Sequence, residues 1–68
     1  MELESLSKSI RTRREERKMT QKELADLLSV SDKTISKWET GRGLPDVVAL
    51  KRLAKIFGCT MDDMVNEP

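Results

Sequence analysis

The apolar residues of this chain recur at intervals of three and four positions, which is the period of an amphipathic helix. Five segments follow that period, and none shows the alternation of apolar and polar residues that is typical of a strand. Only Trp38 and Phe57 are aromatic, which also disfavours a sheet. The sequence therefore predicts an all-α fold, a compact domain of five helices.

The first helix is expected to run from about residue 3 to residue 17. Its apolar stripe consists of Leu3, Leu6 and Ile10. Charged residues continue that stripe toward the C-terminal end of the helix, and they are Arg13, Arg14 and Arg17. The C-terminal half of this helix is therefore predicted to be basic.

Two short helices follow, separated by the polar stretch from Ser29 to Asp32. Thr20, with Glu23 three residues later, predicts a capping box at the start of the second helix. The third helix is expected to begin at Ser31 as its N-cap and to end near Gly41. Because helices this short are unstable alone, the two must pack across the turn between them, and this predicts a helix-turn-helix. The inner face of the second helix is predicted to be Leu24, Ala25 and Leu28.

The fourth helix is predicted to begin at Asp46 as its cap and to end at Gly58. Thr60, with Asp63 three residues later, predicts the cap of a short fifth helix, after which residues 66–68 are expected to fray. The apolar face of the fourth helix is predicted to be Val47, Leu50, Leu53, Ala54 and Phe57. The apolar residues of the fifth are Met61, Met64 and Val65.

The third helix has two different sides. At about 100° per residue, Ile35 and Trp38 define its buried side, and Val30 in the turn completes the shared core. A helix of this width can enter the major groove of DNA and offer polar side chains to base edges. The alternative is an ordinary solvated helix surface, which also looks like this when the helix is considered alone. The outward side is predicted to carry Lys33, Ser36, Lys37 and Thr40.

Composition limits the functions open to the chain. Its 68 residues predict a single domain over residues 1–68, with little room for a deep catalytic cleft. There is no histidine, the carboxylates are scattered, and Cys59 is the single cysteine, so we predict no enzyme, no metal site and no cofactor. Cys59 is expected to be a buried thiol. Whether the domain is the N-terminal part of a longer regulator is left open.

The distribution of charge predicts a basic end of the molecule, and the hydropathy of the chain predicts its location in the cell. The net charge is +1, but residues 8–18 carry six basic and two acidic residues, so one end of the molecule should be positive. A lone cysteine and the absence of an apolar run near 18 residues indicate a cytoplasmic protein, associated with the nucleoid if it binds DNA. Salt-sensitive binding to duplex DNA would separate a DNA-binding domain from a protein-interaction module, such as an antitoxin.

The order of motifs resembles that of the lambda repressor and Cro-like (Xre) DNA-binding domains. The resemblance covers roughly residues 6–65, and two departures from the family pattern are Ser29, where glycine is usual in the turn, and Arg13, where leucine is common. It implies a five-helix domain that binds duplex DNA as a bacterial or phage-type transcription regulator, with repression the expected effect. The motifs that carry the resemblance are MTQKELA, VSDKTISKWETG, the LPD loop, LKRLAKIFG and TMDDMV.

The resemblance also implies roles for individual residues. The positions that read base edges are Ser31, Asp32, Lys33, Ser36 and Lys37. The positions that contact the DNA backbone are Gln21, Thr40 and Arg42. Stabilising the helix dipole is an alternative role for Asp32, and Trp38 is expected in the core rather than stacked on bases.

Two further expectations concern contacts within and between chains. Family members pair an arginine on the first helix with a glutamate on the third, so an ion pair between Arg14 and Glu39 is expected. One short reading helix covers few base pairs, so a homodimer on a palindromic operator is expected. Candidate interface residues, with closure of the core as their alternative role, are Met61, Met64 and Val65.

Overall fold

The computed structural model describes residues 3–65, with side chains from Ser5 onward, and the regular elements in this part of the chain are all helices. The helices are α1 (Leu3–Glu16), α2 (Gln21–Leu28), α3 (Asp32–Glu39), α4 (Val47–Phe57) and α5 (Met61–Val65). The predicted all-α class and the five helical segments are confirmed, with boundaries within about two residues. The predicted fraying of residues 66–68 and the packing of the Leu3 side chain lie outside the described residues.

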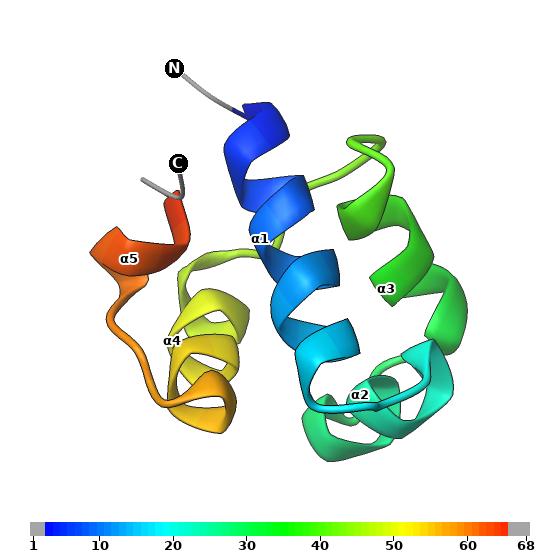
Figure 1. The fold of residues 1–68 in the computed structure, drawn as a ribbon. Helices are drawn as coiled ribbons and strands as arrows, with labels where there is room; N and C mark the ends of the chain where they lie inside the picture. Colours follow the sequence, from blue (N-terminus) through cyan, green and yellow to red (C-terminus); the bar gives the residue numbers. More distant parts are fainter. Residues whose placement is uncertain (1–2, 66–68) are drawn as a thin grey trace.

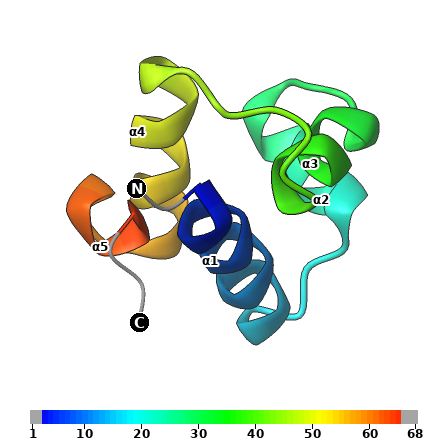
Figure 2. The same ribbon diagram turned by 90° about the horizontal axis from the view of Figure 1, so that it is seen from above.

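Helix α1 is the central element of the bundle. In Figure 1 it crosses the middle of the molecule, and in Figure 2 it separates α4 and α5 from α2 and α3. It packs directly on α3, α4 and α5, whereas α2 packs on α3 and α4. None of the helices formed by residues 3–65 is long and apolar enough to cross a membrane.

One hydrophobic core is shared by all five helices. Ile10, Leu24, Ile35, Leu53 and Met64 are completely buried, and each comes from a different helix. Burying such side chains stabilises the fold by about 1.5–3 kcal/mol each. No helix of this chain has enough apolar surface to be stable alone, so the core forms only when the five come together.

The predicted caps all form. The amide of Glu23 donates to Thr20 Oγ1 at 3.0 Å, and the amide of Thr20 donates to Glu23 Oε1 at 2.8 Å, which completes the capping box. Asp46 accepts the amide of Ala49 at 2.8 Å at the start of α4, and Thr60 and Asp63 exchange the same reciprocal bonds at the start of α5. These bonds satisfy N-terminal amides that have no partner within the helix.

The structure corrects the expectations for Val47 and Cys59, and it decides between the two roles left open for Met64. Val47 was assigned to the inner face of α4, but it is 64% exposed, because it is the first residue of the helix and extends beyond the elements that cover that face. Met64 was a candidate interface residue, but it is completely buried in the core, so its alternative role is the correct one. Met61 and Val65 are half-buried and pack against the core. Cys59 is half-buried rather than enclosed.

Arg17 ties the end of α1 to the end of α4, a role that the sequence did not indicate. Its guanidinium lies 5.2 Å from the centroid of the Phe57 ring and donates a hydrogen bond to the carbonyl oxygen of Phe57. Phe57 is the last residue of α4, where carbonyl groups lack helical partners and the helix dipole is negative. A cation at this point therefore caps α4 from outside.

We expect Arg17→Ala to lower the free energy of unfolding by about 1–2 kcal/mol, because both the ring contact and the carbonyl bond are lost. Urea denaturation followed by circular dichroism measures this. Arg17→Lys keeps the charge but removes the planar group, so it should recover only part of the loss. Full stability in Arg17→Lys would show that charge alone matters.

Ser29 adopts the left-handed conformation that its position in the turn requires. Its φ is 59° and its ψ is 41°, and the next amide, that of Val30, donates to the carbonyl oxygen of Ala25 at 3.0 Å. A side chain at such a position crowds the backbone, whereas glycine does not. Ser29, which stands where the family usually has glycine, is therefore strained, and the turn forms without glycine.

Ser29→Gly should raise the free energy of unfolding by about 1 kcal/mol, because it relieves the left-handed strain. Ser36→Gly is the matched control, since it makes the same chemical change inside helix α3 and should destabilise by about 1 kcal/mol. Thermal and urea unfolding of both variants give the comparison. Destabilisation by Ser29→Gly would contradict the assignment of strain to this turn.

Candidate nucleic-acid interface

Helix α3 presents two chemically different sides. Ile35 and Trp38 are buried, which confirms that the tryptophan belongs to the core. Lys33 and Lys37 lie one turn apart and are exposed. Neither lysine side chain makes an ion pair or hydrogen bond with the part of the chain that the structure describes. Two positive charges are thus held on a rigid helix and remain available to a ligand.

The N-terminal end of α3 is held by Ser31. Its Oγ accepts the amide of Thr34 at 3.2 Å and lies 3.1 Å from Thr34 Oγ1. The predicted N-cap is confirmed, and a base contact by this hydroxyl would have to share it with the cap. Asp32 is exposed in the first turn, where a carboxylate is favoured by the helix dipole. The position therefore suits both roles considered for Asp32.

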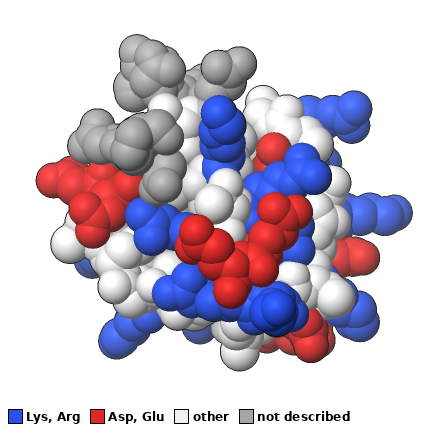
Figure 3. All heavy atoms as spheres, viewed as in Figure 1, with Lys and Arg blue, Asp and Glu red and all other residues white. Residues whose placement is uncertain are grey.

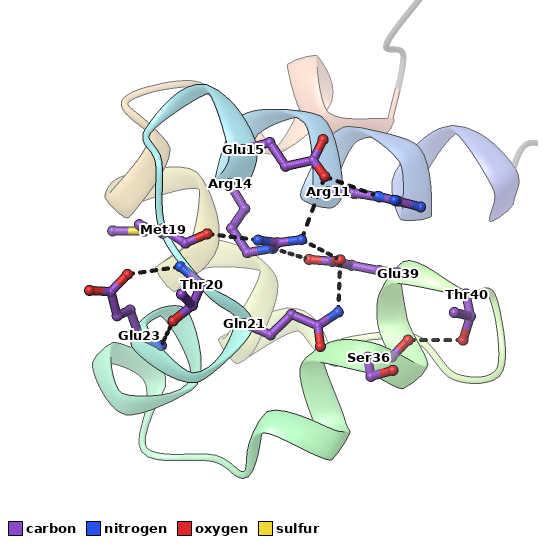
Figure 4. Close-up of polar contacts among 10 residues, drawn as sticks. All are labelled: Arg11, Arg14, Glu15, Met19, Thr20, Gln21, Glu23, Ser36, Glu39 and Thr40. Atoms are coloured by element: carbon purple, nitrogen blue, oxygen red, sulfur yellow. Dashed lines mark hydrogen bonds and ion pairs between the residues drawn. The ribbon is translucent and has the colours of Figure 1, made fainter.

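The C-terminal end of α3 is closed by Thr40. Its hydroxyl donates to the carbonyl oxygen of Ser36 at 2.8 Å, as Figure 4 shows. The proton of Thr40 is therefore used within the helix, and the hydroxyl offers a ligand only its oxygen. Ser36 is half-buried, so it is less accessible than the two lysines.

Arg42 lies in the loop that follows α3. Gly41 before it has a φ of 77°, a conformation that turns the chain sharply and favours glycine. The amide of Arg42 then donates to the carbonyl oxygen of Lys37 at 2.9 Å, which fixes the loop against the end of α3. The Arg42 side chain is exposed and has no ion-pair partner among residues 5–65. The loop thus adds a third cation beside the two of α3.

A buried ion pair holds α3 against α1, as predicted. Arg14 Nε lies 2.7 Å from Glu39 Oε2 and Nη2 lies 3.1 Å from Oε1, a two-pronged contact shown in Figure 4. The side chains are only 12% and 3% exposed. Arg14 also donates to the carbonyl oxygen of Met19 at 2.7 Å. The hydrogen bonds to Glu39 raise the pKa of Arg14, so its guanidinium stays charged.

Gln21 joins this ion pair from the first residue of α2. Its Nε2 donates to Glu39 Oε1 at 3.1 Å. An ionised carboxylate can only accept hydrogen bonds, so the amide nitrogen must face Glu39 and the amide oxygen points away, as in Figure 4. A phosphate contact by Gln21 would therefore use its second amide hydrogen or its backbone amide. Sequence reasoning missed this bond and identified only Arg14 as a partner of Glu39.

The electrostatic character of this face is mixed. Figure 3 shows basic side chains projecting along the edge where α3 lies, with acidic groups between them. Lys22 on α2 pairs with Asp26 at 3.6 Å, so part of the positive charge is neutralised locally. The site consists of a few free cations placed by one helix and one loop, and broad positive charge plays little part in it.

We expect Arg14→Met and Glu39→Gln each to lower the free energy of unfolding by about 3 kcal/mol, because each leaves a buried charge without its partner. A double-mutant cycle should show a coupling of at least about 1 kcal/mol. The exposed pair of Lys22 and Asp26, at 3.6 Å, is the matched control and should couple by about 0.5 kcal/mol or less. Equal coupling in both pairs would show that burial adds nothing to the interaction.

A family model described as "Helix-turn-helix" matches residues 10–64. Among curated proteins, the chain is 44% identical over 48 residues to the HTH-type transcriptional activator BcrR of Enterococcus faecalis. It is 37% identical over 54 residues to Multiprotein-bridging factor 1 of Candida albicans. These alignments cover 71% and 79% of this chain but only 24% and 36% of the relatives, so the chain spans about a quarter to a third of their length.

Solved structures with this fold include regulators and an enzyme. The P22 c2 repressor, solved in complex with a synthetic operator, superposes with a TM-score of 0.86 at 30% identity, over 93% of this chain and 96% of that one. The clp gene regulator ClgR of Corynebacterium glutamicum gives a TM-score of 0.84 at 27% identity, over 93% of this chain and 67% of that one. HppE, solved with its substrate, gives 0.83 at 28% identity, but only 36% of that chain is covered.

Proposed function

The chain belongs to the helix-turn-helix family, and from that membership we propose that it binds double-stranded DNA in a sequence-specific manner, with α3 in the major groove. The observation that carries the proposal is the free polar side of α3. The fold that presents this side matches an operator-bound repressor over nearly its whole length. The side chains of Lys33 and Lys37 are unpaired and project from a helix that is fixed in the fold, so they are free to contact base edges. The proposed function is transcription regulation.

Within this proposal, two groups of residues have different tasks. Lys33 and Lys37 specify sequence, because lysine donors suit the O6 and N7 acceptors of guanine. Arg42 positions the domain, because it extends from the loop beside the end of α3 and would meet phosphate. Asp32 adds an acceptor for the amino group of cytosine at the start of the helix. The supporting contributors are Ser31 and Ser36 for bases and Gln21 and Thr40 for the backbone.

We propose further that two copies bind a palindromic operator and that the effect is repression. A reading helix of eight residues contacts few base pairs, so a second half-site supplies the missing specificity. Met61 and Val65 are half-buried at the surface of α5 and remain available for a weak contact between copies. The likeness to the c2 repressor over 96% of that chain supports repression, although BcrR is named an activator.

A protein-interaction role is the second candidate function. The observation that favours it is the relative in Candida albicans, which is named a bridging factor and aligns with 79% of this chain. The family and the regulator relatives indicate a DNA-binding regulator rather than an enzyme. The match to HppE does not alter this, because the chain corresponds to about a third of that protein.

We expect Arg42→Ala to weaken binding to all duplexes alike and to flatten the dependence of log affinity on log salt by about 0.9. Lys33→Ala or Lys37→Ala should cost about 1–3 kcal/mol and relax base preference at one position per half-site. The operator is first selected from random duplexes. Affinity is then measured across its single-base variants at several salt concentrations.

Lys55→Ala is the matched control, because it removes an exposed lysine from α4, which lies on the opposite side of α1 from α3 in Figure 2. It should leave affinity and base preference unchanged. If Arg42→Ala altered base preference while the lysine variants did not, the assignment of tasks would be reversed. If no duplex bound in a salt-dependent way, the protein-interaction role would replace the DNA-binding one.

A further inference from the structure

The outward side of α4 carries a groove that the proposed DNA contact does not use. It consists of two adjoining hollows that share Arg52 and Lys55, and the larger has a volume of about 580 Å³. We call it the α4 groove. The residues that define it are Leu27, Lys51, Arg52, Lys55, Ile56, Cys59 and Met61.

The floor of the α4 groove is apolar. Ile56, Cys59 and Met61 are half-buried, so each packs against the core and leaves part of its surface uncovered. Leu27, at the end of α2, is 53% exposed and borders the same groove. These side chains come from α2, α4, α5 and the turn between the last two. Uncovered apolar side chains that meet in one hollow are typical of a binding surface, unlike single exposed ones.

The rim of the groove is positive and uncompensated. Lys51 and Lys55 lie one turn apart on α4, and neither makes an ion pair with the described part of the chain. Arg52 leans across the seam between α4 and α2, where its guanidinium lies 3.5 Å from the carbonyl oxygen of Leu28. No carboxylate lines either hollow. This is unusual in a chain whose 13 basic and 12 acidic residues nearly balance.

The α4 groove and the reading side of α3 are on different parts of the molecule. In Figure 2, α4 and α3 lie on opposite sides of α1. Helix α4 packs mainly on α1, α2 and α5. A duplex held by α3 would therefore leave the groove open to a second ligand.

We propose that the α4 groove binds an amphipathic helix with acidic flanks from a partner protein. Leucine-like side chains at helical spacing would cover the apolar floor, and carboxylates beside them would meet Lys51, Arg52 and Lys55. A nucleic-acid backbone has the required charge but no apolar stripe for the floor. A second copy of this chain offers Asp62 and Asp63 on α5, but the adjacent Met64 is completely buried in its own core.

The probe is a fluorescein-labelled helical peptide of about 14 residues, roughly four turns, with leucines along one side and glutamates flanking them. Its partner peptide has lysines in place of the glutamates. Fluorescence anisotropy with the 68-residue chain should show saturable binding of the acidic peptide only. Amide chemical shifts should move in α4 and at Leu27, and not in α3. This result does not depend on DNA binding, so it stands or falls separately from the proposed function.

The variant Arg52→Glu with Lys55→Glu should weaken acidic-peptide binding by about tenfold or more, because it reverses the rim charge. Lys51→Ala with Lys55→Ala is a milder version for use if the reversal impairs folding, as checked by circular dichroism. Leu27→Ser tests the floor and should also weaken binding. Lys8→Glu is the matched control elsewhere on the surface and should have no effect.

Four results would overturn the inference. The first two are equal binding of the acidic and the basic peptide, and unchanged peptide binding by the rim variants. The third is a set of amide chemical-shift changes confined to α3, which would mean that the peptide mimics DNA. The fourth is a change of amide chemical shifts in α4 when duplex DNA is added. Analytical sedimentation tests whether a second copy of the chain occupies the groove, because it measures self-association. Self-association that the rim variants abolish would assign the groove to a contact between two copies of this chain.

Discussion

The arrangement of the bundle depends on a buried charge that three helices share. Glu39 comes from the last turn of α3, is 3% exposed, and receives hydrogen bonds from Arg14 on α1 and from Gln21 on α2. A carboxylate so deeply placed is tolerated only if its partners are all present. Because those partners lie on separate helices, the ion pair penalises any packing in which α3 rotates or slides. Apolar contacts supply most of the stability, and the ion pair selects the angle of the reading helix.

The elements that sequence predicted well are those governed by local chemistry. The caps at Thr20, Ser31 and Asp46 depend on residues three positions apart, so their spacing alone was sufficient. The family pattern added the long-range pairing of Arg14 with Glu39, which no local argument identifies. What could not be predicted depends on the ends of helices in three dimensions. Val47 continues the apolar spacing of α4 but is mostly exposed at the first residue of the helix.

The other contacts that the sequence did not predict join polar side chains to residues far away in the sequence. Arg17 continues the stripe of Leu6 and Ile10, but that stripe does not identify its partner Phe57, which is 40 positions away in the sequence. The bond from Gln21 to Glu39 crosses 18 positions of sequence and has no motif of its own. Within the candidate site, the sequence placed the lysines of α3 on the exposed side correctly. Which of its polar residues touch DNA is decided by a ligand, and the fold of the chain alone does not determine that.

The division of α3 into two sides has a consequence for how such a protein can change over time. Ile35, Trp38 and Glu39 hold the helix in the fold, whereas the side chains of Lys33 and Lys37 make no ion pair or hydrogen bond with the described part of the chain. Mutations at the two lysines therefore meet almost no selection for stability and can be tested against new operators one at a time. A duplicated gene could diverge in the sites it recognises while its folding remains untouched. In such a helix, DNA specificity can evolve independently of folding stability.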